Sequence, residues 1–474
     1  MKWHKKLTTD LREFGIIKRL TDLNSFQFIL ILPTMLIFIL ATVTIVFGVQ
    51  HAGFNWGMVF TWVVWWGMLI ALFVIFGRGW CIMCPFGALG EWVQRLSLWW
   101  KSKWGIGLNL KYPKRLKNLW MAIVFFVIFI FLDSGYGISN SPPLTAGLLV
   151  VLTVGAIWVG LIFEKRTFCL YHCPLTAFIG IASMMAPFEV RRKDADVCRQ
   201  CKTKACFNGS ENTYGCPMNV FQGSGVDKNR DCILCTECVT SCPYNNIKMR
   251  FRPFGYDLWN RKKGKLDESV GSIVIAGAVT IVSLFLVLFL TPVRSAVSSI
   301  LFSGTNPGDW VRIISIGFLF LGGIAVTLLL MYGFSYLSKR FSGVKDIKAK
   351  AFFVNFGYAL VPLGIMKFLA DILDHVLRTW GAVFDVTRAL AKDFPLDRVY
   401  ASELTVRQLV NPAWTYVMQL LLTGIGFGFS LYVAYKLSQR MFADRNIAFK
   451  AFLPIGASVF VVGMAALWAL SAAL

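Results

Sequence analysis

Charged residues are scarce in this chain of 474 residues: only 15% are Asp, Glu, Lys or Arg, whereas 56% are hydrophobic. So little charge excludes a soluble protein with an ordinary polar surface and predicts a polytopic α-helical membrane protein. The 48 basic residues outnumber the 25 acidic ones, which gives a formal net charge of +23. A balance this basic can indicate a nucleic-acid partner, but the distribution of the charges argues against one.

Nine apolar stretches are long enough, or nearly so, to cross a bilayer, which takes about 20 residues in a helix. The third of them is the shortest. They are residues 26–48, 56–76, 119–132, 144–163, 270–290, 311–337, 351–370, 414–435 and 451–474.

Lysine and arginine are absent from two of the loops between these stretches, residues 50–55 and 133–143. By the positive-inside rule, we expect the amino terminus and all the basic loops on the cytoplasmic side of a bacterial or archaeal membrane, and the carboxy terminus outside. Topology and anionic lipid on that side then account for the excess charge. The first apolar stretch is too long for a cleavable signal peptide and is expected to be a retained anchor. The basic residues crowd into alternate segments: 1–24, 77–118, 164–268, 338–350 and 436–450.

Cysteine is absent outside residues 81–242, although the chain contains twelve. All twelve lie in segments predicted to be cytoplasmic, where structural disulfides are disfavoured and metal or redox chemistry is the better expectation. Because residues 269–474 contain none, that half cannot supply thiolate ligands to a metal centre.

Eight cysteines belong to a polar insert, residues 191–268. Its second half contains the C-x2-C-x2-C-x3-C-P run of bacterial ferredoxins, in which three thiolates hold one [4Fe–4S] cluster and the fourth reaches a neighbouring cluster. Its first half contains a stretched version of the same run. The cysteines of the second run are Cys232, Cys235, Cys238 and Cys242, before Pro243, and those of the first are Cys198, Cys201, Cys206 and Cys216, before Pro217.

Crossed ligation of these two runs predicts two clusters within a cytoplasmic ferredoxin module. Zinc is the alternative, since four thiolates also suit that ion. Two adjacent clusters imply one-electron transfer. The cluster 1 cysteines are Cys198, Cys201, Cys206 and Cys242, and the cluster 2 cysteines are Cys216, Cys232, Cys235 and Cys238.

The other four cysteines form two pairs, each following an apolar stretch and preceding a proline. Residues 26–100 and 119–190 therefore look like two copies of one unit, and such repeats commonly meet around a shared site. The two pairs predict a third metal centre, most simply another iron–sulfur cluster. A reversible dithiol, thiols lining a cofactor or quinone pocket, and cysteines that only pack are the alternatives. These membrane-edge cysteines are Cys81, Cys84, Cys169 and Cys173.

Cysteine pairs at the ends of membrane helices, followed by a two-cluster ferredoxin module, resemble the NapH/NosR group of membrane polyferredoxins over about residues 20–255. The second pair, "CLYHCP", has the spacing of that family, whereas "CIMCP" is one residue shorter. The resemblance implies electron exchange between the quinone pool and a redox partner, as in a quinol dehydrogenase subunit. Two other functions stay open: a maturation factor that gives electrons to the metal sites of another enzyme, and a relay subunit of a larger respiratory complex.

The carboxy-terminal half contains a repeat of its own, because residues 337–353 align without gaps with residues 437–453. This repeat predicts two duplicated helical hairpins. We therefore expect three parts in the chain: a membrane domain at 1–190, the ferredoxin module at 191–268 and a second membrane domain at 269–474.

Only four histidines occur: His4, His51, His172 and His375. His51 and His375 both fall near the outer face, where histidines are usually only interfacial, so haem b is not expected. His172 lies inside the second cysteine pair and is expected at a helix end or in support of a ligand.

The segment "MKFLADILDH" places three ionisable residues on one helical face, with Asp374 beside them. Ionisable groups at membrane depth often mark proton or quinone sites, and this segment is a candidate for one. The alternative expectation is that the lysine extends outward to the headgroups. The three residues are Lys367, Asp371 and His375.

Overall fold

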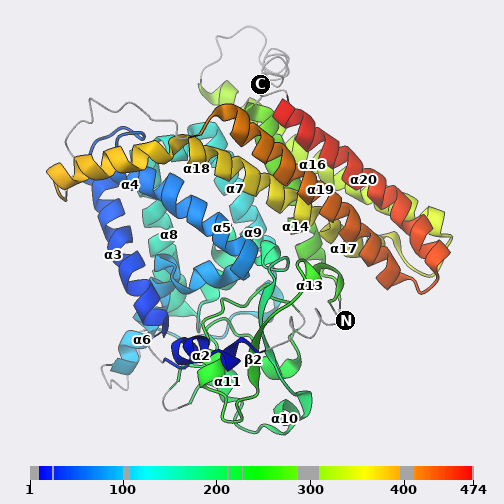
Figure 1. The fold of residues 1–474 in the computed structure, drawn as a ribbon, viewed down its shortest axis with the longest axis horizontal. Helices are drawn as coiled ribbons and strands as arrows, with labels where there is room; N and C mark the ends of the chain where they lie inside the picture. The colour runs from blue at the N-terminus through cyan, green and yellow to red at the C-terminus, as the bar shows by residue number, and fades with distance from the viewer. Residues whose placement is uncertain are drawn as a thin grey trace. The chain divides into compact units, whose positions relative to one another are not determined.

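The computed structural model describes residues 10–23, 26–99, 107–210, 213–226, 228–261, 263–286, 309–395 and 410–471. His4 and the predicted span residues 287–290 and 472–474 lie outside these ranges. The described chain is mainly helical (Figure 1). Its contacts divide it into two compact units, each assembled from separate stretches of sequence. Unit 1 comprises residues 1–43, 71–122 and 146–262, and unit 2 comprises residues 44–70, 123–145 and 263–474.

Seven helical runs in the described part of the chain are long and apolar enough to cross a membrane, which supports a multi-pass membrane protein. Each overlaps one of the predicted stretches. The runs are Phe26–Phe47, Trp56–Gln94, Pro142–Ile162, Ile316–Ser342, Ala349–Lys392, Pro412–Met441 and Arg445–Ser471.

Two of the nine predicted stretches are not among these seven. Residues 119–132 correspond to the apolar helix α7 (Trp120–Tyr136), which has 17 residues. Residues 270–290 overlap α14 (Leu266–Leu286), and the rest of that stretch lies outside the described residues. The count of nine membrane helices therefore stays a prediction, as do the domain boundaries at 190 and 268.

The second membrane run is irregular, and its irregularity positions a cysteine pair. After α4 (Trp56–Val59) come a π-helical segment, Phe60–Trp65, and then α5 (Trp66–Phe76). At Gly77 the backbone turns into the left-handed region, with φ of 57°, and a Cβ there would lie 2.8 Å from Cβ of Ser183. A glycine is therefore required at this turn. A tight 3₁₀ segment, Gly77–Ile82, follows and carries Cys81 to the start of α6 (Pro85–Trp99).

Unit 1 also contains the second cysteine pair and the ferredoxin module. After α8 (Pro142–Ile162), the π-helical segment Phe168–His172 leads into α9 (Leu175–Ala182). The other helices of unit 1 are α2 (Gly15–Thr21), α3 (Phe26–Phe47), which ends in unit 2, α10 (Ala195–Gln200), α11 (Ala205–Asn208), α12 (Glu237–Thr240) and α13 (Tyr256–Trp259).

A two-stranded antiparallel sheet forms the base of the ferredoxin module. Strand β1 (Phe188–Arg192) pairs with β2 (Ile247–Phe251), with Val190 opposite Met249. Alternate β2 residues face inward, as expected for a half-buried strand. Their side chains share a core with Cys238 and Val239, and Cys206, Cys232 and Cys242 pack against it. The cysteine loops are thus part of the core of the module.

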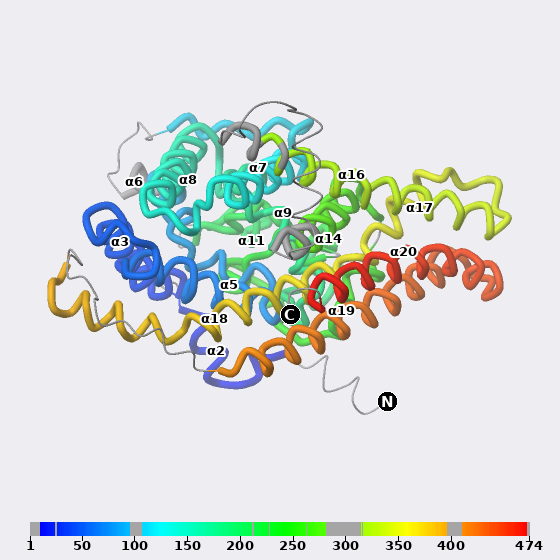
Figure 2. Tube along the Cα trace, turned by 90° about the horizontal axis from the view of Figure 1, so that it is seen from above, coloured from blue at the N-terminus to red at the C-terminus, as the bar shows by residue number. Residues whose placement is uncertain are grey.

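Unit 2 contains the long helices of the carboxy-terminal half. Helices α16 (Asp309–Ser342), α19 (Pro412–Met441) and α20 (Arg445–Ser471) run side by side (Figure 2). Helix α17 (Ala349–Phe356) precedes α18 (Val361–Lys392), which packs on α19. The two copies of the repeat meet where Ser338 donates a hydrogen bond to the carbonyl of Ala451, over 2.6 Å.

Candidate metal centres

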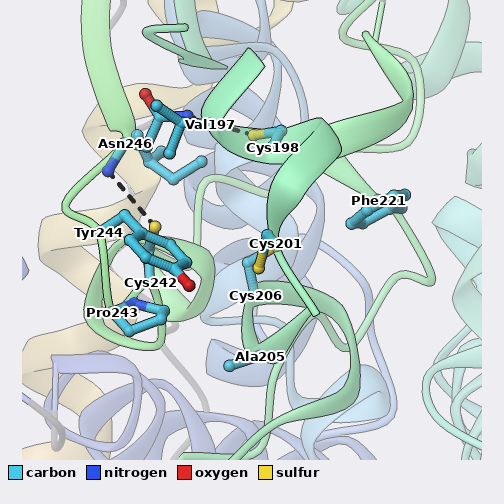
Figure 3. A pocket seen from close by; sticks show the side chains of 11 residues that line it. Val197, Cys198, Cys201, Ala205, Cys206, Phe221, Cys242, Pro243, Tyr244 and Asn246 are labelled. Carbon is cyan, nitrogen blue, oxygen red and sulfur yellow. Dashed lines mark hydrogen bonds between the residues drawn. The ribbon is translucent and has the colours of Figure 1, made fainter. Parts of the chain in front are cut away.

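The cluster 1 cysteines line one hollow in the ferredoxin module (Figure 3). Three of them come from α10, from the loop after it and from α11, and Cys242 comes from the loop after α12. The hollow has about 330 Å³ of space, part of it open to solvent. Asn246 donates to two of the sulfurs: its backbone N–H to Cys242 Sγ at 3.3 Å and its side-chain amide to Cys198 Sγ at 3.2 Å.

The cluster 2 cysteines line a second hollow, also of about 330 Å³. The loop that carries Cys232 and Cys235 has two residues in the left-handed region, Leu234 and Thr236, with φ of 57° and 63°. Such alternating backbone conformations turn successive N–H groups toward an anion. The backbone N–H of Val220 donates to Cys216 Sγ at 3.3 Å.

The grouping of cysteines around the two hollows is the crossed one that the spacing predicts. Cys242, the last cysteine of the second run, lies with three cysteines of the first run, and Cys216 lies with three of the second. Ligation of a metal by these sets stays a prediction. Within the described residues, no group of three or more His, Cys, Asp or Glu side chains has an arrangement that could hold a single metal ion.

Burial disfavours the thiolate form of several of these cysteines. Burial and the neighbouring thiols of Cys242, Cys198 and Cys201 raise the pKa of Cys206 to about 11, and burial likewise raises the pKa of Cys216 to about 11. Thiolates gathered this closely need compensating positive charge, which a bound iron–sulfur cluster supplies. The residues present therefore fit such a cluster in each hollow.

The membrane-edge cysteines of the two repeats are also brought together. Burial raises the pKa of the Cys169 thiol well above its usual value; Arg166 opposes this, and the nearby thiols of Cys173, Cys84 and Cys81 raise it further. A Cβ on Gly87 would lie only 3.1 Å from Cys169 Sγ. The four cysteines thus lie near one another, with Gly87 against the sulfur of Cys169, and four thiolates there fit an iron–sulfur centre.

Two buried arginines and a glutamate surround this site, and sequence reasoning missed all three. Arg166 contacts Glu91 at 2.6 Å and donates to the carbonyl of Cys81 at 2.7 Å. Arg78 donates to the carbonyl of Cys169 at 2.5 Å. A signal was present in the sequence: each arginine stands three residues before the first cysteine of its repeat, with an aromatic residue between them.

His172 lies beside the membrane-edge cysteines, next to an aromatic pair. Its ring packs edge-on against Tyr112, with 5.5 Å between the ring centroids, and Tyr112 stacks on Tyr171. Burial lowers the pKa of His172, and its Nδ1 is buried without a hydrogen-bond partner. An auxiliary role for His172 stays a prediction.

In unit 2 the predicted ionisable segment lies on α18, and its residues separate into two ion pairs. Lys367 contacts Asp371, whereas Asp374 contacts Arg378 at 2.7 Å. His375 is exposed, as is His51, whose ring stacks on Phe54. The alternative expectation that Lys367 extends outward is wrong, because its side chain is only 1% exposed.

Comparisons with known proteins place iron–sulfur chemistry on the membrane-edge repeats. The family model described as a 4Fe-4S binding domain matches twice, at residues 58–107 and 145–193. These two matches contain the two cysteine pairs and overlap the two repeated units. No solved structure matches this chain.

Two relatives are similar to parts of the chain. An uncharacterised protein of Methanocaldococcus jannaschii is 25% identical over 194 residues, which cover 39% of this chain and 76% of the relative. YccM of Escherichia coli, whose name assigns it to electron transport, is 29% identical over 98 residues, or 20% of this chain and 25% of its own length. Together with the family match, they support an iron–sulfur protein of the ferredoxin type. The narrower NapH/NosR resemblance stays a prediction.

Proposed function

We propose that this protein exchanges electrons between the membrane quinone pool and a redox partner, through two [4Fe–4S] clusters in the ferredoxin module and a third iron–sulfur centre at the membrane-edge cysteines. The observation that carries the proposal is the meeting of the two cysteine pairs, one from each repeat matched by the 4Fe-4S family model. Arg78 of the first repeat donates to the carbonyl of Cys169, and Arg166 of the second donates to that of Cys81. A dithiol or packing role would not require all four sulfurs at one site.

The three cysteine sets form a series within unit 1, which supports a route for electrons. The membrane-edge set adjoins the cluster 2 loop, because Arg78 donates both to the carbonyl of Cys169 and to that of Arg230, two residues before Cys232. The cluster 2 set adjoins cluster 1, since Cys238 lies in the core of the module and Cys206 packs against that core. Cluster 1, beside α10, is then the place where a partner in solution exchanges electrons.

The membrane arrangement follows from the charges. The module lies in the basic segment 164–268, which we place on the cytoplasmic side of a bacterial or archaeal membrane. The membrane-edge cysteines follow two spans on that side and lie where a lipid-soluble quinone can approach them.

A second quinone-related site is proposed on α18, narrowed to Lys367 and Asp371. A buried lysine paired with a carboxylate inside a membrane helix is costly and commonly functional. Quinone chemistry couples protons to electrons, and an ionisable pair of this kind can hold a proton at a carboxylate oxygen. Asp374 and His375 are left out of this narrowed site, because Asp374 pairs with Arg378 and His375 is exposed.

Iron counting with a redox titration tests the proposal. Purified protein reconstituted with lipid is expected to contain about twelve iron atoms per chain, whereas a Cys81→Ser/Cys169→Ser variant contains about eight. Menaquinol and ubiquinol are offered to both, and reduction of the clusters is followed by EPR. We expect quinol-dependent reduction in the wild type and its loss in the variant; oxidation of dithionite-reduced clusters by added quinone reports the reverse direction.

Two results would contradict parts of the proposal. An unchanged iron count in the double variant removes the third centre. A full iron count without any electron exchange with quinone favours the maturation or relay function instead. A Lys114→Gln variant on an exposed loop of unit 1 serves as the control, and it should keep both the iron and the quinone reaction.

A further inference from the structure

Each membrane-edge repeat contains the same short pattern, an arginine three residues before its first cysteine. Arg78 precedes Cys81 in "RGWC", and Arg166 precedes Cys169 in "RTFC". The two arginines are thus equivalent positions of a duplicated unit.

The two arginines exchange partners between the repeats. Arg78 of the first repeat donates through Nη2 to the carbonyl of Cys169 in the second, at 2.5 Å. Arg166 of the second repeat donates through Nη1 to the carbonyl of Cys81 in the first, at 2.7 Å. These reciprocal hydrogen bonds hold the two cysteine pairs against each other.

Both guanidinium groups are almost fully buried, with side-chain exposures of 1% for Arg78 and 0% for Arg166. Burying a cation is costly unless an anion compensates it. Two carboxylates face the arginines. Glu91 contacts Arg166 at 2.6 Å, but Asp231 lies 3.8 Å from Arg78 and 2.6 Å from Arg230. Nε of Arg78 has no hydrogen-bond partner. Arg78 therefore has less compensation from carboxylates than Arg166 has.

The same arginines also contact the loops of cluster 2. Arg78 Nη1 donates to the carbonyl of Arg230, near Cys232, at 3.2 Å. The backbone N–H of Arg166 donates to the carbonyl of Pro217, next to Cys216, at 3.0 Å. The arginines consequently lie between the membrane-edge cysteines and the cluster 2 cysteines.

We propose that Arg78 and Arg166 are positioning residues that join the two cysteine pairs into one site and raise the reduction potential of that centre and of cluster 2. Four thiolates around an iron–sulfur cluster leave net negative charge, and each added electron increases it. A buried cation therefore stabilises the reduced form, because it attracts that charge in a medium of low dielectric. The inference rests on the membrane-edge centre and cluster 2 of the proposed function, but not on their exchange of electrons with quinone.

The consequence concerns the direction of electron flow. A cluster of low reduction potential would make oxidation of quinol unfavourable. Two buried cations raise the potential of the cluster and so make that reaction less unfavourable. Because they lie between two centres, they raise both potentials together and keep electron transfer between the centres close to balanced.

The test is an EPR redox titration of the purified full-length protein and its variants. Arg78→Gln removes a cation and should lower both potentials, whereas Arg78→Lys keeps the charge and should lower them less. Glu91→Gln removes an anion while Arg166 stays charged, and should raise both potentials. Arg115→Gln, on an exposed loop of unit 1, should leave them unchanged.

The opposite directions of these shifts in reduction potential distinguish an electrostatic effect of the charges from a general loss of structure. If Arg78→Gln and Glu91→Gln move the potentials the same way, or neither moves them with iron content intact, the inference is wrong. Loss of the membrane-edge iron in Arg78→Gln but not in Arg78→Lys supports the positioning role. In that case, the shift in reduction potential is measured on cluster 2 alone. A protein that never exchanges electrons with quinol yet shows the opposite shifts at cluster 2 refutes the proposed function and keeps the inference.

Discussion

At the scale of single residues, the membrane part of the chain contains two ion pairs on one helix with different surroundings. Lys367 is 1% exposed and contacts Asp371, while Asp374, three residues after Asp371, contacts Arg378, which is 40% exposed. A charge that cannot reach water depends on its partner, whereas a solvated charge does not. The two aspartates are therefore a matched pair for testing what burial contributes.

We predict that Asp371→Asn destabilises the protein by about 3–5 kcal/mol, because the buried lysine loses the carboxylate it contacts. Asp374→Asn should cost at most about 1 kcal/mol, since Arg378 can be hydrated. Thermal unfolding in detergent, followed by tryptophan fluorescence, measures both. Equal midpoints for the two variants would show that Lys367 does not depend on Asp371.

At the scale of elements, the packing of α6 against α8 depends on two glycines that bring the backbones into contact. A Cβ on Gly160 would lie 2.6 Å from the carbonyl oxygen of Gly90, and a Cβ on Gly90 would lie 2.8 Å from that of Ala156. Ala156 and Gly160 form the small-x-x-x-small spacing that permits close approach of membrane helices. Gln94 of α6 strengthens the contact by donating to the carbonyl of Gly160 at 2.8 Å.

Gly160→Ala should therefore destabilise unit 1 by about 1–3 kcal/mol, because backbone atoms cannot move aside as a flexible side chain can. Gly147, on the same helix with nothing within 4 Å of its Cβ position, is the control. Gly147→Ala should be neutral or stabilising by up to about 1 kcal/mol, as alanine is the better helix former. The midpoint of thermal unfolding and the retention of iron measure the stability of both variants. A midpoint for Gly160→Ala at or above that of the wild type would contradict the close approach of the two helices.

The sequence predicts the elements well where the pattern is a property of the local chain. The stretch 26–48 is helix Phe26–Phe47, and 144–163 is helix Pro142–Ile162, because a long apolar run has few alternatives in a membrane. The π-helical and 3₁₀ segments between Phe60 and Ile82 gave no such signal. The hydrogen-bond register of these segments is determined by the side chains that pack against them, and those side chains come from distant parts of the sequence.

In the candidate site, too, local sequence predicts some features, whereas others depend on contacts with distant sequence. Cysteine spacing was enough to predict which sulfurs line each hollow, because short loops limit where their thiols can reach. Arg78 and Arg166 were missed, since a basic residue at the end of a membrane helix also satisfies the positive-inside rule. Their role depends on a contact between the two repeats. Arg166 and Cys81 are 85 residues apart in the sequence, and one copy of the motif alone does not reveal that they meet.

At the scale of the whole molecule, all twelve cysteines lie in unit 1, and unit 2 has none. The cluster of buried hydrophobic side chains around the sheet has six members, one of them Cys238, and three of the five partly buried residues packed against it are also cysteines. Because cysteines are so large a part of this cluster, we expect metal binding to be coupled to the folding of the module. Helices α16, α18, α19 and α20 contain no cysteine.

Removal of iron should consequently unfold the module while leaving unit 2 intact. After treatment with ferricyanide and EDTA, we expect the amides of β1 and β2 to lose protection from hydrogen–deuterium exchange, whereas those of α18, α19 and α20 keep theirs. EDTA alone under anaerobic reducing conditions, which leaves the clusters in place, is the control and should change neither region. Loss of protection in both units together would mean that the chain unfolds as one cooperative body, and unchanged strands would mean that the core of the module is sufficient without metal. The strands are the critical reporters, because their inward side chains contact the cysteine loops directly, so that any collapse of the two hollows reaches the sheet first.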